Sequence, residues 1–228
     1  MTLHTFVHRT RQSLLALTGI LTAIAFTSSA HAGFFIPKNT TMAMVTLSPD
    51  EQNYELAYGF DRRISGSLGV TRVKEGGSDA AWRNVVMAQV AYLVKRQSMN
   101  DGIFNTYVWA GPMAERLEGE GKTRAGLQTG VWVDFETRWV YTRVKAHTFQ
   151  SKDWRRNEVV AQAMLAPYAA DYEDIASWGG LQVKRVSGER TELTPFVRFF
   201  QRDWWIDAGI SVDRTHRNNF FVNLIKTF

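Results

Sequence analysis

The feature that most constrains this chain is an alternation of apolar and polar residues with a period of two. Successive side chains of a β-strand point to opposite faces, so this period predicts strands with one apolar and one polar face. A tilted strand crosses a bilayer in about 9–11 residues, and most of the alternating segments have a similar length. Twelve segments show the pattern: Thr40–Leu47, Gln52–Phe60, Arg63–Lys74, Trp82–Lys95, Ile103–Ala110, Arg124–Glu136, Arg138–Thr148, Asn157–Ala166, Ile175–Val186, Glu192–Gln201, Trp204–Val212 and Asn218–Phe228.

Two stretches are also compatible with helices, because Asp79–Val94 and Glu158–Ala170 are rich in alanine and valine. If both were helical, ten strands would remain, which is still an even number. We predict twelve strands, with ten as the alternative.

The connections between these segments fall into two alternating classes. An even number of antiparallel strands with short turns at one end and longer loops at the other is typical of outer-membrane barrels. The sequence therefore predicts an all-β fold, an antiparallel up-and-down transmembrane β-barrel with both termini on the periplasmic side. The short set is Asp61–Arg62, Glu136–Arg138 and Arg202–Asp203, and the longer or more charged set is Glu75–Ala81, Gly111–Thr123, Phe149–Arg156, Ser187–Thr191 and Asp213–Arg217.

The first 32 residues have the pattern of a secretory signal. Arg9 and Arg11 precede the apolar run Ser13–Phe26, and Ala30-His31-Ala32 fits a small-residue cleavage site. The apolar run is too short to span a bilayer, which needs about 20 residues. We expect cleavage after Ala32, one barrel domain at residues 33–228, and a location in the outer membrane of a Gram-negative bacterium.

Charge and cysteine content exclude several functions. The chain has a net charge of +5, and two of its basic residues, with no acidic residue, lie in the first 32 positions, so residues 33–228 carry +3. Basic and acidic residues alternate along the chain, which argues against a nucleic-acid partner. The chain contains no Cys, which excludes disulfides, thiol catalysis and cysteine-based metal sites.

Aromatic residues gather at one level when strand directions are assigned from the loop classes. They face outward at the periplasmic edge, where barrels carry an aromatic girdle at the membrane interface. The predicted girdle consists of Phe60, Tyr92, Phe104, Phe135, Phe199, Trp204 and Phe228.

The last segment has apolar residues on one face, namely Phe220, Val222, Leu224 and the terminal Phe228. This pattern resembles the C-terminal signature of outer-membrane β-barrel proteins, which the barrel-assembly machinery reads. The resemblance covers about ten residues. Lys226 departs from it, and a lysine at the interface can extend its ammonium group to water.

The opposite face of the strands is polar and points into the barrel. We expect a lumen network of Glu55, Asp134, Arg143, Lys145, Lys184, Arg198 and Asp207, with ion pairs across the interior and Lys95 also inward. Two alternatives remain open. In the first, paired side chains and bulky aromatics fill the interior of a narrow barrel. In the second, the same side chains line a pore that selects solutes. We favour the filled lumen.

An enzymatic alternative rests on two histidines near the outer ends of strands. Ser151 lies close to His147, and Ser211 and Asp213 lie close to His216. Some small outer-membrane barrels are lipid-modifying enzymes with a Ser–His–acid group near the rim, and such groups are recognised by geometry. We find no motif of those enzyme families and therefore expect no catalytic, metal or cofactor-binding residue. The sequence favours a non-enzymatic narrow channel or structural membrane protein over a rim-site enzyme.

Basic residues near the outer rim, together with the apolar outer face, indicate membrane partners. Guanidinium groups suit phosphates, so outer-membrane lipids and lipopolysaccharide are the expected partners. The rim residues are Arg155, Arg156, Arg190, Arg214 and Arg217.

Overall fold

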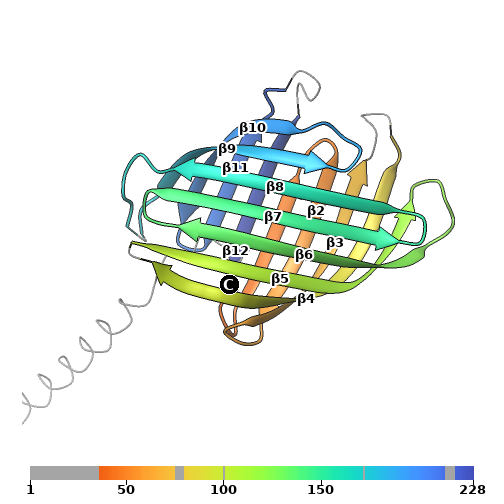
Figure 1. Cartoon of the computed structure of the whole chain (residues 1–228), viewed down its shortest axis with the longest axis horizontal. Helices are drawn as coiled ribbons and strands as arrows, with labels where there is room; N and C mark the ends of the chain where they lie inside the picture. Colours follow the sequence, from red (N-terminus) through yellow and green to blue (C-terminus); the bar gives the residue numbers. More distant parts are fainter. Residues whose placement is uncertain (1–35, 75–79, 100, 172, 214–218) are drawn as a thin grey trace, which may run out of the picture. The chain divides into compact units, whose positions relative to one another are not determined.

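The computed structural model describes residues 36–74, 80–99, 101–171, 173–213 and 219–228. These residues form a closed barrel of twelve strands, each antiparallel to its neighbours in the sequence, and pairing of β1 with β12 completes the ring (Figure 1). Within the same ranges, no helix is long and apolar enough to cross a membrane. The strands are β1 Thr41–Leu47, β2 Glu51–Gly59, β3 Ile64–Lys74, β4 Trp82–Met99, β5 Gly102–Leu117, β6 Arg124–Glu136, β7 Val140–Ser151, β8 Arg155–Leu165, β9 Ala176–Val186, β10 Glu192–Gln201, β11 Trp204–Ile210 and β12 Phe220–Thr227.

Odd-numbered strands run from the end of the barrel that holds Phe228, called here the terminal end, toward the opposite or distal end. The predicted fold class is confirmed, including the strand count of twelve. Most of each stretch with a helical alternative lies in a strand, residues 82–94 in β4 and residues 158–165 in β8. The predicted signal segment and its cleavage site lie outside the described residues.

Two predicted connections are wrong in part. Gly111–Thr123 was expected to be a loop, but β5 continues through Gly111 and Pro112 to Leu117. A Cβ at Gly111 would lie 1.9 Å from the Ala88 carbonyl oxygen, so glycine permits close approach of β4 at this point. Pro112 has no N–H to donate, yet its pairing with Leu127 of β6 is kept.

The loop expected at Phe149–Arg156 is also shorter than predicted. β7 runs to Ser151 and β8 begins at Arg155, because Phe149 and Trp154 turn inward and stack with ring centroids 5.8 Å apart.

The alternation of short and long connections has two exceptions. The distal connection 48–50 is a tight turn, in which the Glu51 N–H donates to Ser48 Oγ at 2.9 Å. The terminal connection 166–175 is long and is held by the Tyr168 hydroxyl, which donates to the Ile175 carbonyl at 2.6 Å. Hydrophobic periodicity locates strands, but it does not indicate the length or hydrogen bonding of the connections between them.

A β-bulge in β4 overturns the predicted orientation of Lys95. Leu93 pairs with Tyr107, but the next pair is Lys95 with Thr106. The extra residue shifts the alternation by one position, so Arg96 lies opposite the buried Asn105 and Lys95 takes the outward side.

The barrel is apolar outside and polar inside. Its outward strand positions include large exposed hydrophobic side chains, whereas charged and amide side chains are buried within. A water-soluble protein has the reverse distribution, and an outward apolar band is the arrangement of barrels that sit in lipid. Examples on the outer face are Leu56, Leu68, Val86, Val90, Leu127, Val144, Val159, Leu181, Val197 and Ile206.

Candidate functional site in the barrel lumen

Charged side chains meet across the distal half of the lumen. Glu51 of β2 accepts a bond from Lys184 Nζ of β9 at 2.5 Å and lies 3.8 Å from a guanidinium nitrogen of Arg156 on β8. In a ring of twelve strands, β8 is six strands from β2 in either direction. Glu158 of β8 joins this group, 3.4 Å from Lys184 and 3.6 Å from Arg156. We call Glu51, Arg156, Glu158 and Lys184 the cross-lumen bridge.

Local structure explains why these four side chains point inward. Glu51 is the first residue of β2, directly after the tight turn, and is in phase with the inward Asn53 and Glu55. Arg156 and Glu158 are likewise in phase with the buried Gln162 of β8. Strand alternation therefore directs opposite charges from both walls into the same space.

A second cluster lies beside the bridge near the distal end. Glu115 is 1% exposed, and its two carboxylate oxygens accept bonds from Arg83 at 2.6 Å and from the Ser151 hydroxyl at 2.9 Å. The Arg83 guanidinium lies 4.8 Å from the ring centroid of Trp154. This part of the interior is packed with Val73, Val85, Met87, Met113, Phe149 and Trp154.

Small residues on β3 leave room for amide and carboxylate groups in the middle of the lumen. Glu55 accepts bonds from Ser67 Oγ at 2.5 Å and from Gln89 Nε2 at 2.7 Å. Across the interior, Gln128 is fully buried and its side-chain oxygen lies 2.7 Å from His147 Nε2. Each of these side chains forms at least one hydrogen bond inside the barrel.

A bidentate ion pair lies in the terminal half. Arg198 of β10 donates to the two carboxylate oxygens of Asp207 on β11 at 2.6 and 2.8 Å. The guanidinium also lies over the rings of Tyr141 and Trp205, 5.2 and 5.0 Å from their centroids. Arg198 is 2% exposed and Asp207 is 3% exposed, so this charge pair is enclosed by protein.

Asp134 occupies a separate position in the same half. Its oxygens accept bonds from Asn105 Nδ2 and Trp132 Nε1, both at 2.7 Å. Arg143 lies over Trp132, 4.4 Å from the ring centroid.

The predicted lumen residues therefore lie inside the barrel in separate groups rather than in one network. Lys145 contacts Glu158 at 3.9 Å and so adjoins the cross-lumen bridge. Ion pairs across the interior were expected among Asp134, Arg143, Arg198 and Asp207, but Arg198 and Asp207 pair between neighbouring strands, where register places them opposite each other. The functional role of the predicted network stays a prediction.

Sequence reasoning missed four of the residues that carry most of the buried charge: Glu51, Glu115, Arg156 and Glu158. Glu51 and Glu115 lay in predicted connections, and Arg156 was expected at the rim, although it is 3% exposed inside the barrel. Extending the predicted strands by a few residues at the distal end would have found Glu51, Glu115 and Arg156, and applying the alternation within Asn157–Ala166 would have found Glu158.

The structure places His147 in the lumen rather than at the lipid-facing rim. Its ring lies between Trp109 and Phe149, with centroid distances of 5.4 and 4.1 Å. Ser151, its proposed catalytic neighbour, donates to Glu115 instead. His216 lies outside the described residues.

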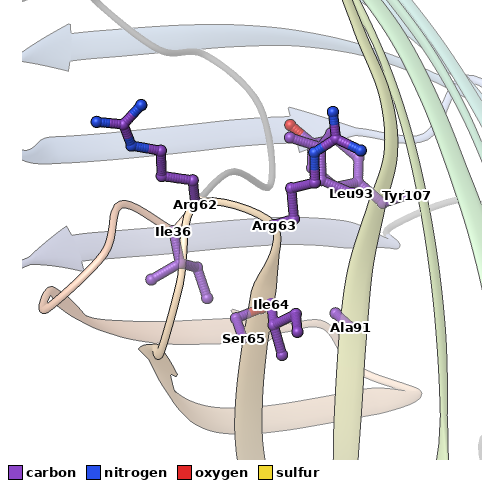
Figure 2. A pocket seen from close by; sticks show the side chains of 8 residues that line it. All are labelled: Ile36, Arg62, Arg63, Ile64, Ser65, Ala91, Leu93 and Tyr107. Atoms are coloured by element: carbon purple, nitrogen blue, oxygen red, sulfur yellow. The ribbon is translucent and has the colours of Figure 1, made fainter.

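A shallow pocket opens at the terminal end between the β2–β3 turn and β4 and β5. Figure 2 shows Arg63 beside Leu93 and Tyr107, whereas Arg62 extends away from them. The Leu93 N–H donates to the Arg63 carbonyl at 2.8 Å, which fixes the turn against β4.

The residues of the predicted girdle occupy outward positions. Phe60 is 57% exposed, Tyr92 42%, Phe199 45%, Trp204 46% and Phe228 71%. Phe104 and Phe135 are half-buried and lie opposite each other on β5 and β6. Their role at a membrane interface stays a prediction.

On β12 the exposed Phe220 and the half-buried Val222 and Leu224 share the outward side with Lys226. Lys226 Nζ lies 2.5 Å from an Asp203 carboxylate oxygen and 4.7 Å from the ring centroid of Trp204. The lysine that breaks the apolar pattern is therefore paired at the terminal edge.

Deleting Phe228 is expected to reduce the yield of assembled barrel. Phe228 closes the seam, because its N–H donates to the Thr41 carbonyl at 2.8 Å and its carbonyl accepts from the Thr41 N–H at 3.3 Å. Heat-modifiable protein in outer-membrane fractions measures the effect, with Thr227→Ser as the control. Equal yields from all three chains would contradict a role of Phe228 in assembly.

No protein-family model matches this sequence, and no curated protein matches it either. Solved structures that it resembles include the KdgM porin, with 10% identity, a TM-score of 0.49 and coverage of 83% of this chain and 99% of the porin chain. The translocator domain of autotransporter NalP from Neisseria meningitidis has 11% identity and a TM-score of 0.41, with 96% of this chain and 97% of that chain covered. CdiB from Acinetobacter baumannii has 7% identity and a TM-score of 0.31, with coverage of 84% and 60%.

Proposed function

We propose that this chain is a non-enzymatic integral protein of a bacterial outer membrane whose lumen is closed by its own side chains. The membrane location is supported by the apolar outer face, since exposed residues such as Leu68 (68%) and Leu127 (64%) gain free energy in lipid. In the part of the chain that the structure describes, the closed barrel leaves no unpaired sheet edge, and strands in the hydrocarbon region require such closure.

The main observation that supports a closed lumen is the cross-lumen bridge. Glu51 contacts Lys184 and Arg156 from the opposite wall, so the two walls are within side-chain reach. The layers beneath it contain paired groups that are almost wholly buried, including Gln128, Asp134 and Arg198. A continuous water path would leave such groups exposed, so a structural barrel fits better than an open channel.

The geometry around the histidine argues against a rim-site lipid enzyme. A lipid substrate approaches from the outer face, whereas His147 lies inside and contacts Gln128, Trp109 and Phe149. Ser211, the other candidate nucleophile, directs its hydroxyl to the Leu193 carbonyl at 3.4 Å.

Conductance in planar bilayers tests the closed lumen. The unaltered protein is expected to show no steady conductance. Glu51→Ala is expected to raise the open fraction about tenfold or more, because it removes charge-assisted bonds worth about 1.5–3 kcal/mol. Glu118→Ala removes the same charge from an exposed distal position and is the matched control.

Two results would contradict the proposal. Steady conductance of the unaltered protein would show that the barrel is a narrow solute channel. Equal closure in Glu51→Ala would show that the cross-lumen bridge is not what closes the lumen.

A further inference from the structure

A row of hydrogen-bond donors crosses the outer face of the barrel near the distal end. Strand register places Gln52, Arg72, Asn84 and Arg116 side by side on β2, β3, β4 and β5. We call these four residues the donor row. Adjacent strands lie about 4.8 Å apart, so the Cα atoms of Arg72 and Arg116 are roughly 10 Å apart.

Alternation shows that the donor row faces outward. The residues on either side of Arg72, Thr71 and Val73, are 3% and 1% exposed and point inward. Val85 and Glu115, which follow Asn84 and precede Arg116, are 0% and 1% exposed. Arg72 and Arg116 therefore project from the wall that faces the surrounding medium.

The surface changes abruptly from apolar to basic at this row. The next outward row toward the terminal end is Tyr54, Val70, Val86 and Ala114. The first three of these are 47%, 42% and 58% exposed. The donor row itself contains no carboxylate, and Asp50 and Glu118 belong to the row above it, with Lys74 and Trp82.

The donor row lies along the barrel axis where the distal boundary of the apolar outer face is expected. Eight residues of β4 separate Asn84 from Tyr92, which is roughly 26 Å along the strand. With the usual tilt of barrel strands this is about 20 Å along the barrel axis, close to the apolar height of about 25 Å in such barrels. Headgroups of the outer leaflet lie at that level.

One guanidinium group of the donor row is held by an aromatic ring, and the other is exposed. Arg72 lies over the ring of Trp82, 4.9 Å from its centroid, and this contact holds its guanidinium group in place. Arg116 is exposed and forms no ion pair among the described residues. Two guanidinium forks separated by one amide side chain are suited to bind phosphate oxygens.

From this arrangement we infer that the donor row binds the phosphates of a phosphorylated outer-leaflet glycolipid, lipopolysaccharide. This inference rests on the proposed membrane location. The apolar row beneath receives the acyl chains, while Arg72 and Arg116 each hold a phosphate oxygen. Asn84 donates to the sugar or phosphate oxygens between them, and Gln52 donates on the other side of Arg72.

Lipid retention measured by native mass spectrometry tests this site. The folded barrel is mixed with diphosphorylated lipid A, with the same lipid A after removal of its phosphates, or with phosphatidylglycerol. Arg72→Gln/Arg116→Gln is expected to bind diphosphorylated lipid A about tenfold more weakly than the unaltered protein, equivalent to ~1.4 kcal/mol. Lys152→Gln/Arg185→Gln removes the same charge from an exposed position in the β7–β8 turn and an outward position of β9, and is expected to bind normally.

Three results would overturn the inference: unchanged binding by Arg72→Gln/Arg116→Gln, an equal loss in the control pair, or equal retention of phosphatidylglycerol and lipid A by the unaltered barrel. Insertion into liposomes is measured on the same samples. Failure of the unaltered chain to insert would instead refute the membrane location, so the two failures are distinguishable.

Discussion

Arg198→Ala is expected to destabilise the barrel by about 3–5 kcal/mol, because it leaves the Asp207 carboxylate buried without its partner. The pair is bidentate and almost fully enclosed, with side-chain exposures of 2% and 4%. Asn223, the other donor to Asp207, lies 3.4 Å away and cannot replace a guanidinium. Thermal unfolding in detergent, followed by the loss of heat-modifiable mobility, measures the change.

The double variant Arg198→Leu/Asp207→Leu distinguishes two free energies: the cost of burying one charge without its partner, and the net contribution of the ion pair to stability. Replacing both charges with apolar groups is expected to recover most of the lost stability, since a buried pair contributes little beyond its own desolvation. If Arg198→Ala leaves the unfolding temperature unchanged, water reaches Asp207 and the terminal half of the lumen is open.

Val131→Arg is expected to cost about 2–4 kcal/mol, the penalty for a cation on the lipid face near the bilayer midplane. Val131 is 37% exposed and has Val108 and Ala146 as its outward neighbours on β5 and β7. Folding equilibria in liposomes measure the penalty.

Gln150→Arg is the control, because Gln150 is outward and exposed near the distal end of β7. At such an edge the penalty falls to about 0–1 kcal/mol. Equal costs at both positions would contradict a membrane-embedded outer face. A charge at the buried Gln128 is not a neutral control, since its amide is bound to His147.

Strand periodicity made most of the fold predictable. Val131 and Trp132 show why: adjacent residues on β6 differ in exposure, at 37% and 9%, as the period of two requires. The period of two predicts only which side of the sheet a residue faces. It carried no information on the β4 bulge that turned Lys95 outward, because one extra residue reverses every orientation beyond it.

The candidate site was less predictable for a related reason. Arg198 and Asp207 lie on neighbouring strands, so their pairing can be predicted from the sequence once the register of β10 and β11 is known. Contacts between opposite walls depend on how the sheet curves as a whole. Glu51 and Lys184 are therefore a pair that no local pattern in the sequence indicates.

The cross-lumen bridge also links permeability to the order of folding. Glu51 and Lys184 are 133 positions apart in the chain, so their contact requires most of the intervening strands to be paired already. Before β1 and β12 pair, we expect the sheet to be open and its charged inner face to contact water. The interior is therefore closed only when the ring of strands is complete. Ion leakage through an assembling barrel should stop at the step in which β1 pairs with β12.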